Sequence, residues 1–410
     1  MARENNEVED FPLRRRVMQL SRRVTETHPY LFHLIDEKRK AAQKMGIDVI
    51  SLAIGDPDRP TPGFVLDLMD EEMHNPRNHL YPSYKGEPDF CVAVSEWFKK
   101  RFDVQLDPEK EIMAVIGAKD AVSHLPFVFL DPGDSGLVTD PAYPVYQVAI
   151  GFAGAEVIRV PLREETGFLP DLDAIPVAAA ERAKIMFVNY PNNPTSAVAD
   201  PGFFERLVAF AIKYDIVVLS DNAYSEVYFE EEDRPVSIMG VKGAKDIAIE
   251  IHSFSKTFNM TGWRVGFVTG GKRLIEAFLT LKSNFDSGVF MAVQRAAARA
   301  LGHPQGEAFK RERTALFKGR RDRIAAVLDD LRFRFQLPRA SYYFWVRIPD
   351  SFHSSVEFCA ALLEKKGLVV TPGVGYGPAG ERFFRVSMTA PDDRIEQGME
   401  RLKEFVKEQL

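Results

Sequence analysis

The chain has 410 residues, with 53 Lys and Arg against 59 Asp and Glu, and therefore a formal net charge of −6. This length suits two or three domains with a substantial core. The acidic balance and the lack of a long basic segment exclude nucleic acid as the main partner. No apolar run reaches the roughly 18 residues of a membrane-spanning helix, and the acidic N-terminus resembles no targeting peptide, so we expect a cytoplasmic protein that binds no membrane.

The sequence predicts no metal site. Its two cysteines, Cys91 and Cys359, lie too far apart for a CxxC pair and are too few for a disulfide framework. The eight histidines show no H-E-x-x-H or comparable ligand spacing. We therefore expect both cysteines to be buried, free thiols.

Short β-branched apolar runs alternate along the chain with segments of helical patterning. Continuous apolar strands that alternate with helices indicate a mostly parallel sheet, buried on both faces. The predicted fold class is therefore α/β, with a seven-stranded sheet in a large domain. The predicted strands are 112–116, 136–139, 156–160, 184–189, 216–221, 248–253 and 265–269.

From about residue 309 the pattern changes to a long charged helix, strand-like segments at 341–347 and 383–388, and a final amphipathic helix from Asp392. This predicts a smaller α+β domain, which the segment 49–52 joins because one short strand cannot stand alone. The predicted organisation is an N-terminal arm (1–20), a small domain from both chain ends (21–62 and 296–410) and a large domain (63–295).

Polar residues collect directly after the predicted strands of the large sheet. In such sheets, ligands bind beyond the carboxyl ends of the strands. We therefore expect one site at this edge. The polar stretches are 117–120, 140–143, 189–195, 220–222 and 253–256.

Lys256 follows a predicted strand and lies next to Ser253 and Ser255, eight residues before Arg264. Such a lysine can form a Schiff base with an aldehyde cofactor, while hydroxyls and a guanidinium bind a phosphate. Two other interpretations stay open. The letters S-x-x-K and S-D-N (220–222) also occur in penicillin-binding proteins, but in the reverse order and with a K-T-G that this chain lacks. A lysine in a serine-rich turn can also lie simply at the surface.

The neighbouring strand ends offer what a pyridine cofactor needs: an anion at the ring nitrogen, donors to the phenolic oxygen and a stacking face. Asp221 is the candidate anion, Asn193 and Tyr224 are candidate donors, and Tyr143 is a candidate stacking ring. The turn 117–119 can direct backbone N–H groups at a phosphate. Each residue alone also fits a structural role as a cap, turn former or core aromatic. Their joint occurrence favours the cofactor site.

The ordered motifs Asn-Pro-Thr, Asp-x-x-Tyr, Ser-x-Ser-Lys-x₅-Gly-x-Arg-x-Gly and a late Phe-Arg-Val-Ser resemble those of the class I and II aminotransferases, which are fold type I pyridoxal-phosphate enzymes. The resemblance implies a homodimer with its sites at the subunit interface. It implies that Lys256 is the Schiff-base lysine, that Asp221 pairs with the ring nitrogen, and that Asn193 and Tyr224 bind the phenolic oxygen. The implied phosphate ligands are Ala118, Lys119, Ser253, Ser255 and Arg264.

The resemblance also implies a substrate site. Arg385 would clamp the substrate α-carboxylate with Gly55 and Asn193, and Tyr81 would reach the cofactor phosphate of the neighbouring subunit. We expect burial and Arg264 to lower the pKa of Lys256, so that its amine acts as a base near neutrality. One departure from many relatives is Ser196, where they have glycine after Asn-Pro-Thr.

Segments at 28–32, 54–62, 140–146, 166–173 and 370–377 resemble the branch of the family that exchanges the amino group of LL-diaminopimelate with 2-oxoglutarate in lysine biosynthesis. Similar segments occur in alanine and broad-specificity aminotransferases, which is the alternative. A C–S lyase or decarboxylase on the same fold, and a regulator, also stay open, although a 20-residue arm leaves no room for a regulator's DNA-binding domain. Candidates for recognising the substrate side chain are Tyr30, Lys119, Tyr146 and Asn284.

Overall fold

The computed structural model describes residues 19–27 and 31–409. Most of the predicted N-terminal arm and Tyr30 lie outside these residues. Among the described residues, none of the helices has the length and apolar character needed to cross a membrane. Cys91 and Cys359 are both buried and free, as predicted.

A seven-stranded sheet organises the larger part of the molecule, in the strand order β2-β8-β7-β6-β5-β3-β4. β8 is antiparallel to both of its neighbours, and all other neighbouring strands are parallel. The predicted α/β fold class and mostly parallel sheet are therefore confirmed. The strands are β2 (Ile112–Val115), β3 (Ser135–Asp140), β4 (Glu156–Pro161), β5 (Ala183–Asn189), β6 (Val217–Asp221), β7 (Ala248–Ser253) and β8 (Gly266–Gly270).

Both faces of this sheet are buried except along the edge strand β4, which explains the continuous apolar runs of the other strands. Along β5, Met186 and Val188 belong to one hydrophobic cluster and Ile185 and Phe187 to another, because successive side chains point to opposite faces. The first cluster is continued by α4 (Pro88–Phe102) and α9 (Pro201–Tyr214) on that face, and by α13 (Met291–Leu301), which packs on α4 and on α3 (Gly63–Met73). On the second face pack α5 (Ala118–His124), α7 (Val145–Phe152) and α12 (Lys272–Lys282).

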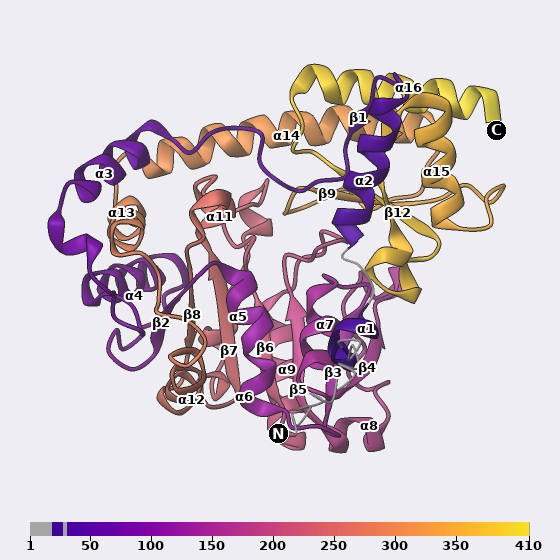
Figure 1. Ribbon diagram of the computed structural model, residues 1–410. Coiled ribbons are helices and arrows are strands. Elements are labelled where there is room, and N and C mark those ends of the chain that lie inside the picture. Colours follow the sequence, from indigo (N-terminus) through magenta and orange to yellow (C-terminus); the bar gives the residue numbers. More distant parts are fainter. Residues whose placement is uncertain (1–18, 28–30, 410) are drawn as a thin grey trace, which may run out of the picture.

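Two small sheets form a second core. β9 (Tyr343–Arg347), β12 (Phe383–Ser387) and β11 (Thr371–Pro372) are antiparallel, whereas β1 (Ile50–Ser51) pairs in parallel with β10 (Leu368–Val369). The N-terminal strand thus joins C-terminal ones, as predicted. Figure 1 shows the long α14 (Gly306–Asp330), in orange, running along the top of the molecule towards this core. The predicted domain limits, 21–62 with 296–410 and 63–295, stay a prediction.

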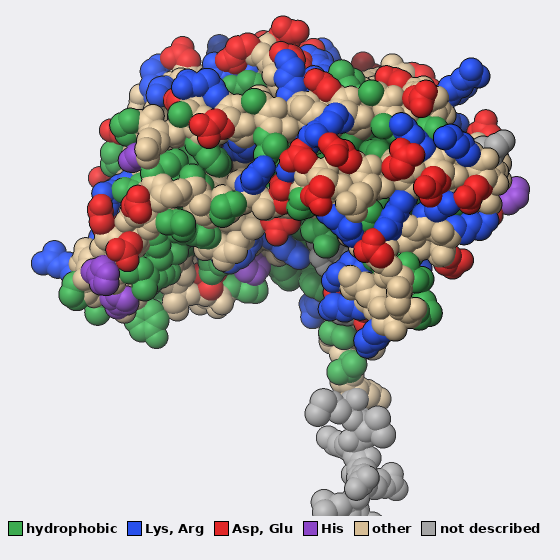
Figure 2. All heavy atoms as spheres, turned by 90° about the horizontal axis from the view of Figure 1, so that it is seen from above, with side chains coloured by type: hydrophobic (Ala, Val, Ile, Leu, Met, Phe, Trp, Pro, Cys, Tyr) green, Lys and Arg blue, Asp and Glu red, His purple; other side chains and the backbone are tan. Residues whose placement is uncertain are grey.

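The remaining helices complete the covering of the two cores. α15 (Ser355–Lys366) and α16 (Asp392–Gln409) pack on the small sheets. Seen from above, charged side chains of both signs mix over this part of the surface (Figure 2). The shorter or peripheral helices are α1 (Arg22–Thr25), α2 (Leu31–Lys44), α6 (Pro126–Phe129), α8 (Val177–Arg182), α10 (Ala244–Ile247) and α11 (Phe254–Thr257).

Arg320 on α14 joins distant segments through a buried ion pair. Its guanidinium donates to Asp58 Oδ1 at 2.6 Å and to Asp58 Oδ2 at 2.8 Å, and also to Asp392 Oδ2 at 3.1 Å. Asp58 lies in the connection from β1 to α3, and Asp392 begins α16. The fully buried Arg320 therefore holds the connection between β1 and α3 against α14 and α16.

We expect Asp58→Ala to lower the free energy of unfolding by about 3 kcal/mol, because it leaves a buried guanidinium with part of its charge uncompensated. Chemical denaturation measures this change. The matched control is Asp350→Ala, which removes an almost fully exposed partner of Arg382 and should leave the unfolding midpoint unchanged. Equal stability of the two variants would contradict the role of Arg320.

Candidate active site

A cavity of about 390 Å³ lies at the carboxyl ends of β5, β6 and β7, and residues of the small sheets close it from the other side. The structure thus brings together residues that lie up to 331 positions apart, from Ile54 to Arg385. The predicted site residues that line the cavity are Gly55, Ala118, Lys119, Tyr143, Tyr146, Asn193, Asp221, Tyr224, Ser253, Ser255, Lys256, Arg264 and Arg385.

Lys256 places a reactive amine in the cavity. It lies on α11, directly after β7, and its Nζ donates to the carbonyl oxygen of Gly55 at 2.6 Å. Burial lowers the pKa of Lys256 to about 8; the charge of Asp56 opposes this, and Arg385 and Arg264 add to it. A substantial fraction of this amine is therefore neutral near physiological pH, which is the form that acts as nucleophile or base.

Asp221 places a carboxyl at the base of the same cavity, at the end of β6. Its Oδ2 accepts from the Tyr146 hydroxyl at 2.8 Å, and its Oδ1 accepts from the Ala223 N–H at 3.1 Å. Burial raises the pKa of Asp221, while these hydrogen bonds and the charge of His252 act in the opposite direction. A buried carboxyl in this state gains stability from a cationic ligand group such as a protonated ring nitrogen.

Two cations lie at another wall of the cavity. Burial and the nearby Arg264 lower the pKa of Lys119, because its ammonium is poorly hydrated and is repelled by the guanidinium. A bound anion would stabilise both the Lys119 and the Arg264 charges. Gly117 precedes Lys119 with a φ of 75°, and a Cβ there would overlap the Arg264 guanidinium. Glycine thus permits the guanidinium to lie against the turn. The Ser253 hydroxyl accepts from the Ser255 N–H at 3.1 Å beside it.

Arg385 enters the cavity from β12 and is fully buried. Its Nη1 donates to Asn193 Oδ1 at 2.8 Å, and its Nη2 donates to the carbonyl oxygen of Ala53. Its Cζ lies 4.0 Å from the centre of the Tyr343 ring. Neighbouring groups thus fix a planar guanidinium, the geometry that suits bidentate binding of a carboxylate.

Two predicted site residues that the structure describes, Tyr81 and Asn284, do not line this cavity. Tyr81 is 89% exposed, and the Nδ2 of Asn284 donates to the carbonyl oxygen of Thr280 at the end of α12 at 2.9 Å. Tyr30 lies outside the described residues. The roles given to these three residues therefore stay predictions.

The sequence analysis missed several cavity residues. Asn189, which ends β5, belongs to the predicted polar stretch 189–195 but was given no role of its own. Its Nδ2 donates to the Asp221 carbonyl oxygen, and its Oδ1 accepts from the Asn193 N–H, both at 2.8 Å. Tyr343 gave no signal, because it begins an aromatic strand typical of a core. The other unpredicted lining residues are Ile54, Asp56, Val122, Ala223 and Thr261.

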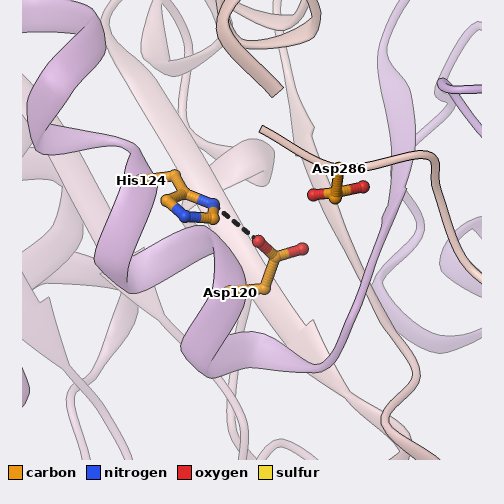
Figure 3. Close-up of side chains that lie close together, drawn as sticks. All are labelled: Asp120, His124 and Asp286. Atoms are coloured by element: carbon orange, nitrogen blue, oxygen red, sulfur yellow. Dashed lines mark ion pairs between the residues drawn. The ribbon is translucent and has the colours of Figure 1, made fainter. Parts of the chain in front are cut away.

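Asp120 and His124 on α5 lie close to Asp286, which follows α12, and the three residues offer potential metal ligands (Figure 3). However, the buried Lys282 ammonium lies 2.7 Å from Asp120 Oδ2 and 2.5 Å from Asp286 Oδ2. This ammonium supplies the positive charge that a metal ion would bring. The cluster is therefore an ion-pair network that joins the end of α12 to α5.

The family model of the class I and II aminotransferases matches residues 47–402. The chain belongs to this family. This aminotransferase is 46% identical over 384 residues to an LL-diaminopimelate aminotransferase of Nitratidesulfovibrio vulgaris. The aligned region covers 94% of this chain and 98% of that relative. The chain is 44% identical over 387 residues to an enzyme of the same name from Aquifex aeolicus, covering 94% and 99%.

Solved structures of aminotransferases share the fold of this chain. The aspartate aminotransferase of Thermus thermophilus with maleate superposes with a TM-score of 0.88 at 28% identity, covering 95% of this chain and all of that chain. Substrate-bound BacF of Bacillus subtilis superposes with a TM-score of 0.89 at 36% identity, covering 95% and 98%. The predicted aminotransferase family and its fold are therefore confirmed.

As a member of this family, the chain is a pyridoxal-phosphate-dependent enzyme. The cavity fits that cofactor on physical grounds. Lys256 offers a partly neutral amine for the aldehyde, Asp221 a carboxyl for the ring nitrogen, and the Lys119 and Arg264 charges a place for the phosphate. These side chains thus have the charges that the aldehyde, the ring nitrogen and the phosphate of the cofactor require.

In protein freed of cofactor, we expect Lys256 to react with pyridoxal phosphate with a pH midpoint near its pKa of about 8, because only the neutral amine attacks an aldehyde. The rate should fall about tenfold for each pH unit below this midpoint. Borohydride reduction followed by peptide mass spectrometry measures the reaction site by site, with the exposed Lys272 as internal control. A midpoint at the ordinary lysine value near 10.4 would contradict the effect of burial.

Proposed function

We propose that this aminotransferase transfers the amino group of LL-diaminopimelate to 2-oxoglutarate in lysine biosynthesis. The observation that carries this proposal is the similarity, over more than nine-tenths of both chains, to relatives named for that reaction. The proposed setting is a cytoplasmic biosynthetic enzyme.

The proposed cofactor contacts follow from the positions in the cavity. Bound pyridoxal phosphate supplies an electron sink for the negative charge that develops at the substrate α-carbon. Asp221 keeps the ring nitrogen protonated, Asn193 and Tyr224 donate to the phenolic oxygen, and Tyr143 stacks on the ring. The proposed phosphate ligands are Ala118, Lys119, Ser253, Ser255 and Arg264.

Lys256 is the proposed catalytic base. Its lowered pKa lets Nζ accept the α-proton of the amino acid near neutral pH, and the positive charges of Arg385 and Arg264 help to keep the amine neutral while it is free of the cofactor. The Gly55 carbonyl, which accepts from Nζ at 2.6 Å, orients the amine within the cavity. Acceptance and return of one proton by the same amine suits a reaction that runs in both directions.

Arg385 is the proposed clamp for the substrate α-carboxylate, together with Asn193 and the backbone of Gly55. The Asn193 oxygen and the Ala53 carbonyl fix the orientation of its guanidinium. A substrate carboxylate would therefore bind to N–H donors that are already in place. Tyr30, Lys119, Tyr146 and Asn284 stay candidates for the substrate side chain. The Tyr146 hydroxyl already donates to Asp221, so it can accept a hydrogen bond from the substrate but can donate one only after an exchange of partner.

A homodimer is the proposed assembly. The exposed Tyr81 belongs to a set of exposed large apolar side chains around α3 and after α12, the kind of surface that protein interfaces cover. Hydrophobic side chains also gather at the left of the view in Figure 2. A partner that covers this set would let Tyr81 and Asn284 approach the neighbouring cavity. The set is Leu66, Met73, Leu80, Tyr81, Tyr84, Phe285 and Phe290.

The substrate is tested by mixing the holoenzyme with one amino acid at a time and following the absorbance of the bound cofactor. We expect rapid conversion with LL-diaminopimelate and glutamate, and slow conversion with alanine and aspartate. Rapid conversion with alanine and none with LL-diaminopimelate would favour an alanine or broad-specificity enzyme. Carbon dioxide or a cleaved C–S bond in place of a 2-oxo acid would indicate a decarboxylase or lyase.

We expect Arg385→Gln to lower kcat/KM for amino donors by about 100-fold or more, because a buried bidentate contact to the carboxylate is lost. Steady-state kinetics with LL-diaminopimelate measure the loss. Arg382→Gln is the matched control, since Arg382 pairs with the exposed Asp350 outside the cavity, and its kcat/KM should stay within about twofold. Equal kinetics of both variants would contradict the clamp.

A further inference from the structure

Tyr343 lines the cavity, but neither the sequence motifs nor the proposed function assign it a role. It begins β9, and only 2% of its surface is exposed. Its hydroxyl oxygen lies 2.7 Å from that of Tyr224, and its ring lies under the Arg385 guanidinium, 4.0 Å from Cζ. One side chain therefore contacts both the proposed cofactor donor and the proposed carboxylate clamp.

The ring of Tyr343 has little freedom to move. A Cβ on Gly55 would overlap the Tyr343 hydroxyl, so the ring lies directly against the backbone that also accepts from Lys256. The guanidinium of Arg385 covers one face of the ring, a contact that cation–π attraction favours. The ring and the guanidinium therefore orient each other.

The direction of the hydrogen bond between the two tyrosines follows from the number of protons. Each hydroxyl carries one proton, and Tyr224 can give its own to the cofactor's phenolic oxygen only if Tyr343 donates to Tyr224. Burial raises the pKa of Tyr224 well above its usual value, so that its proton stays available. The titratable groups that face Tyr224 are Tyr342, Tyr343, Asp221 and Arg385.

Ser196 anchors the backbone of Tyr343 to the loop that carries Asn193. The Tyr343 carbonyl oxygen can only accept, so the Ser196 hydroxyl donates to it at 2.6 Å and accepts from the Ser341 hydroxyl at 2.7 Å. Ser196 and Ser341 both have a φ of 61°, a strained conformation for a residue with a Cβ. Two buried hydrogen bonds offset this strain.

We propose that Tyr343 is a positioning residue for amino transfer: it directs the Tyr224 proton towards the cofactor's phenolic oxygen and fixes the plane of Arg385, with Ser196 as its anchor. This inference rests on the proposed roles of Tyr224 and Arg385. It also assigns a specific role to Ser196, the residue found where many relatives have glycine.

The hydroxyl is tested in the holoenzyme with Tyr343→Phe, which keeps the ring. Loss of the donated hydrogen bond makes Tyr224 a weaker donor, so negative charge on the phenolic oxygen is less stabilised and the proton of the cofactor–lysine linkage is held more tightly. The pH midpoint of the cofactor absorbance should therefore rise by about half a unit. KM for LL-diaminopimelate should stay within about twofold, because the ring still supports Arg385.

Tyr190→Phe is the matched control, since it removes a buried hydroxyl that donates to the Phe168 carbonyl at 2.8 Å outside the cavity. It should leave the absorbance midpoint unchanged. An unchanged midpoint in Tyr343→Phe, together with a raised one in Tyr224→Phe, would overturn the inference about the hydroxyl. If Tyr224→Phe also leaves the midpoint unchanged, the proposed cofactor role of Tyr224 fails, and the hydroxyl inference fails with it.

The anchor is tested by comparing Ser196→Ala with Ser196→Gly. Alanine removes both hydrogen bonds and keeps the strain, whereas glycine removes both and also relieves the strain. If the anchor acts through Tyr343, both variants raise KM for LL-diaminopimelate by about fivefold with a smaller change in kcat, and glycine restores only thermal stability.

Recovery of the parent KM in Ser196→Gly, or an unchanged KM in both variants, would overturn the anchor. Ser95→Ala is the control, because Ser95 is buried and donates to the Leu106 carbonyl at 2.6 Å away from the cavity. Its KM should equal that of the parent. Arg385→Gln is measured in parallel, and an unchanged KM there would show that the clamp, rather than its anchor, is wrong.

Discussion

The burial of the Arg385 guanidinium is the constraint on which the rest of the site depends. A guanidinium removed from water is costly unless other groups satisfy its N–H donors. The partners come from the segment after β1, the loop after β5 and the start of β9, as the Ala53 carbonyl, the Asn193 oxygen and the Tyr343 ring. These segments must meet for Arg385 to be buried, and their meeting forms the wall of the cavity.

The same wall sets the chemistry of Lys256. The amine is removed from water by the residues that close the cavity, and Arg385 and Arg264 add positive charge around it. Both effects disfavour the ammonium form, whereas Asp56 favours it, and the balance lies near a pKa of 8. The closure that prepares a carboxylate site thus also prepares a base, since one desolvated volume serves both groups.

Much of the fold and of the site was predictable because their signals are local. All seven strands of the large sheet appear close to the predicted limits, and for all but the edge strand β4 the reason is that a strand buried on both faces leaves a continuous apolar run. The rule that ligands bind beyond the carboxyl ends of parallel strands predicted that Lys119, Asn193, Asp221 and Lys256 lie at one edge of the sheet. The structure places all four around one cavity. The same rule did not predict Tyr343 as a cavity residue, because Tyr343 lies at the start of its strand, among aromatic residues that pack in the core.

The sequence by itself determined the fold class, the strand ends and the residue types of the cofactor site, because periodicity and turn chemistry are written in neighbouring residues. Only the tertiary structure decided how Ser196 meets Tyr343, how Arg320 pairs with Asp58, and that Lys282 supplies the charge between Asp120 and Asp286. Each of these contacts joins residues more than 140 positions apart, with the exception of the pair Lys282 and Asp286. Contacts of this kind follow from the path of the whole chain and leave no pattern in any short segment.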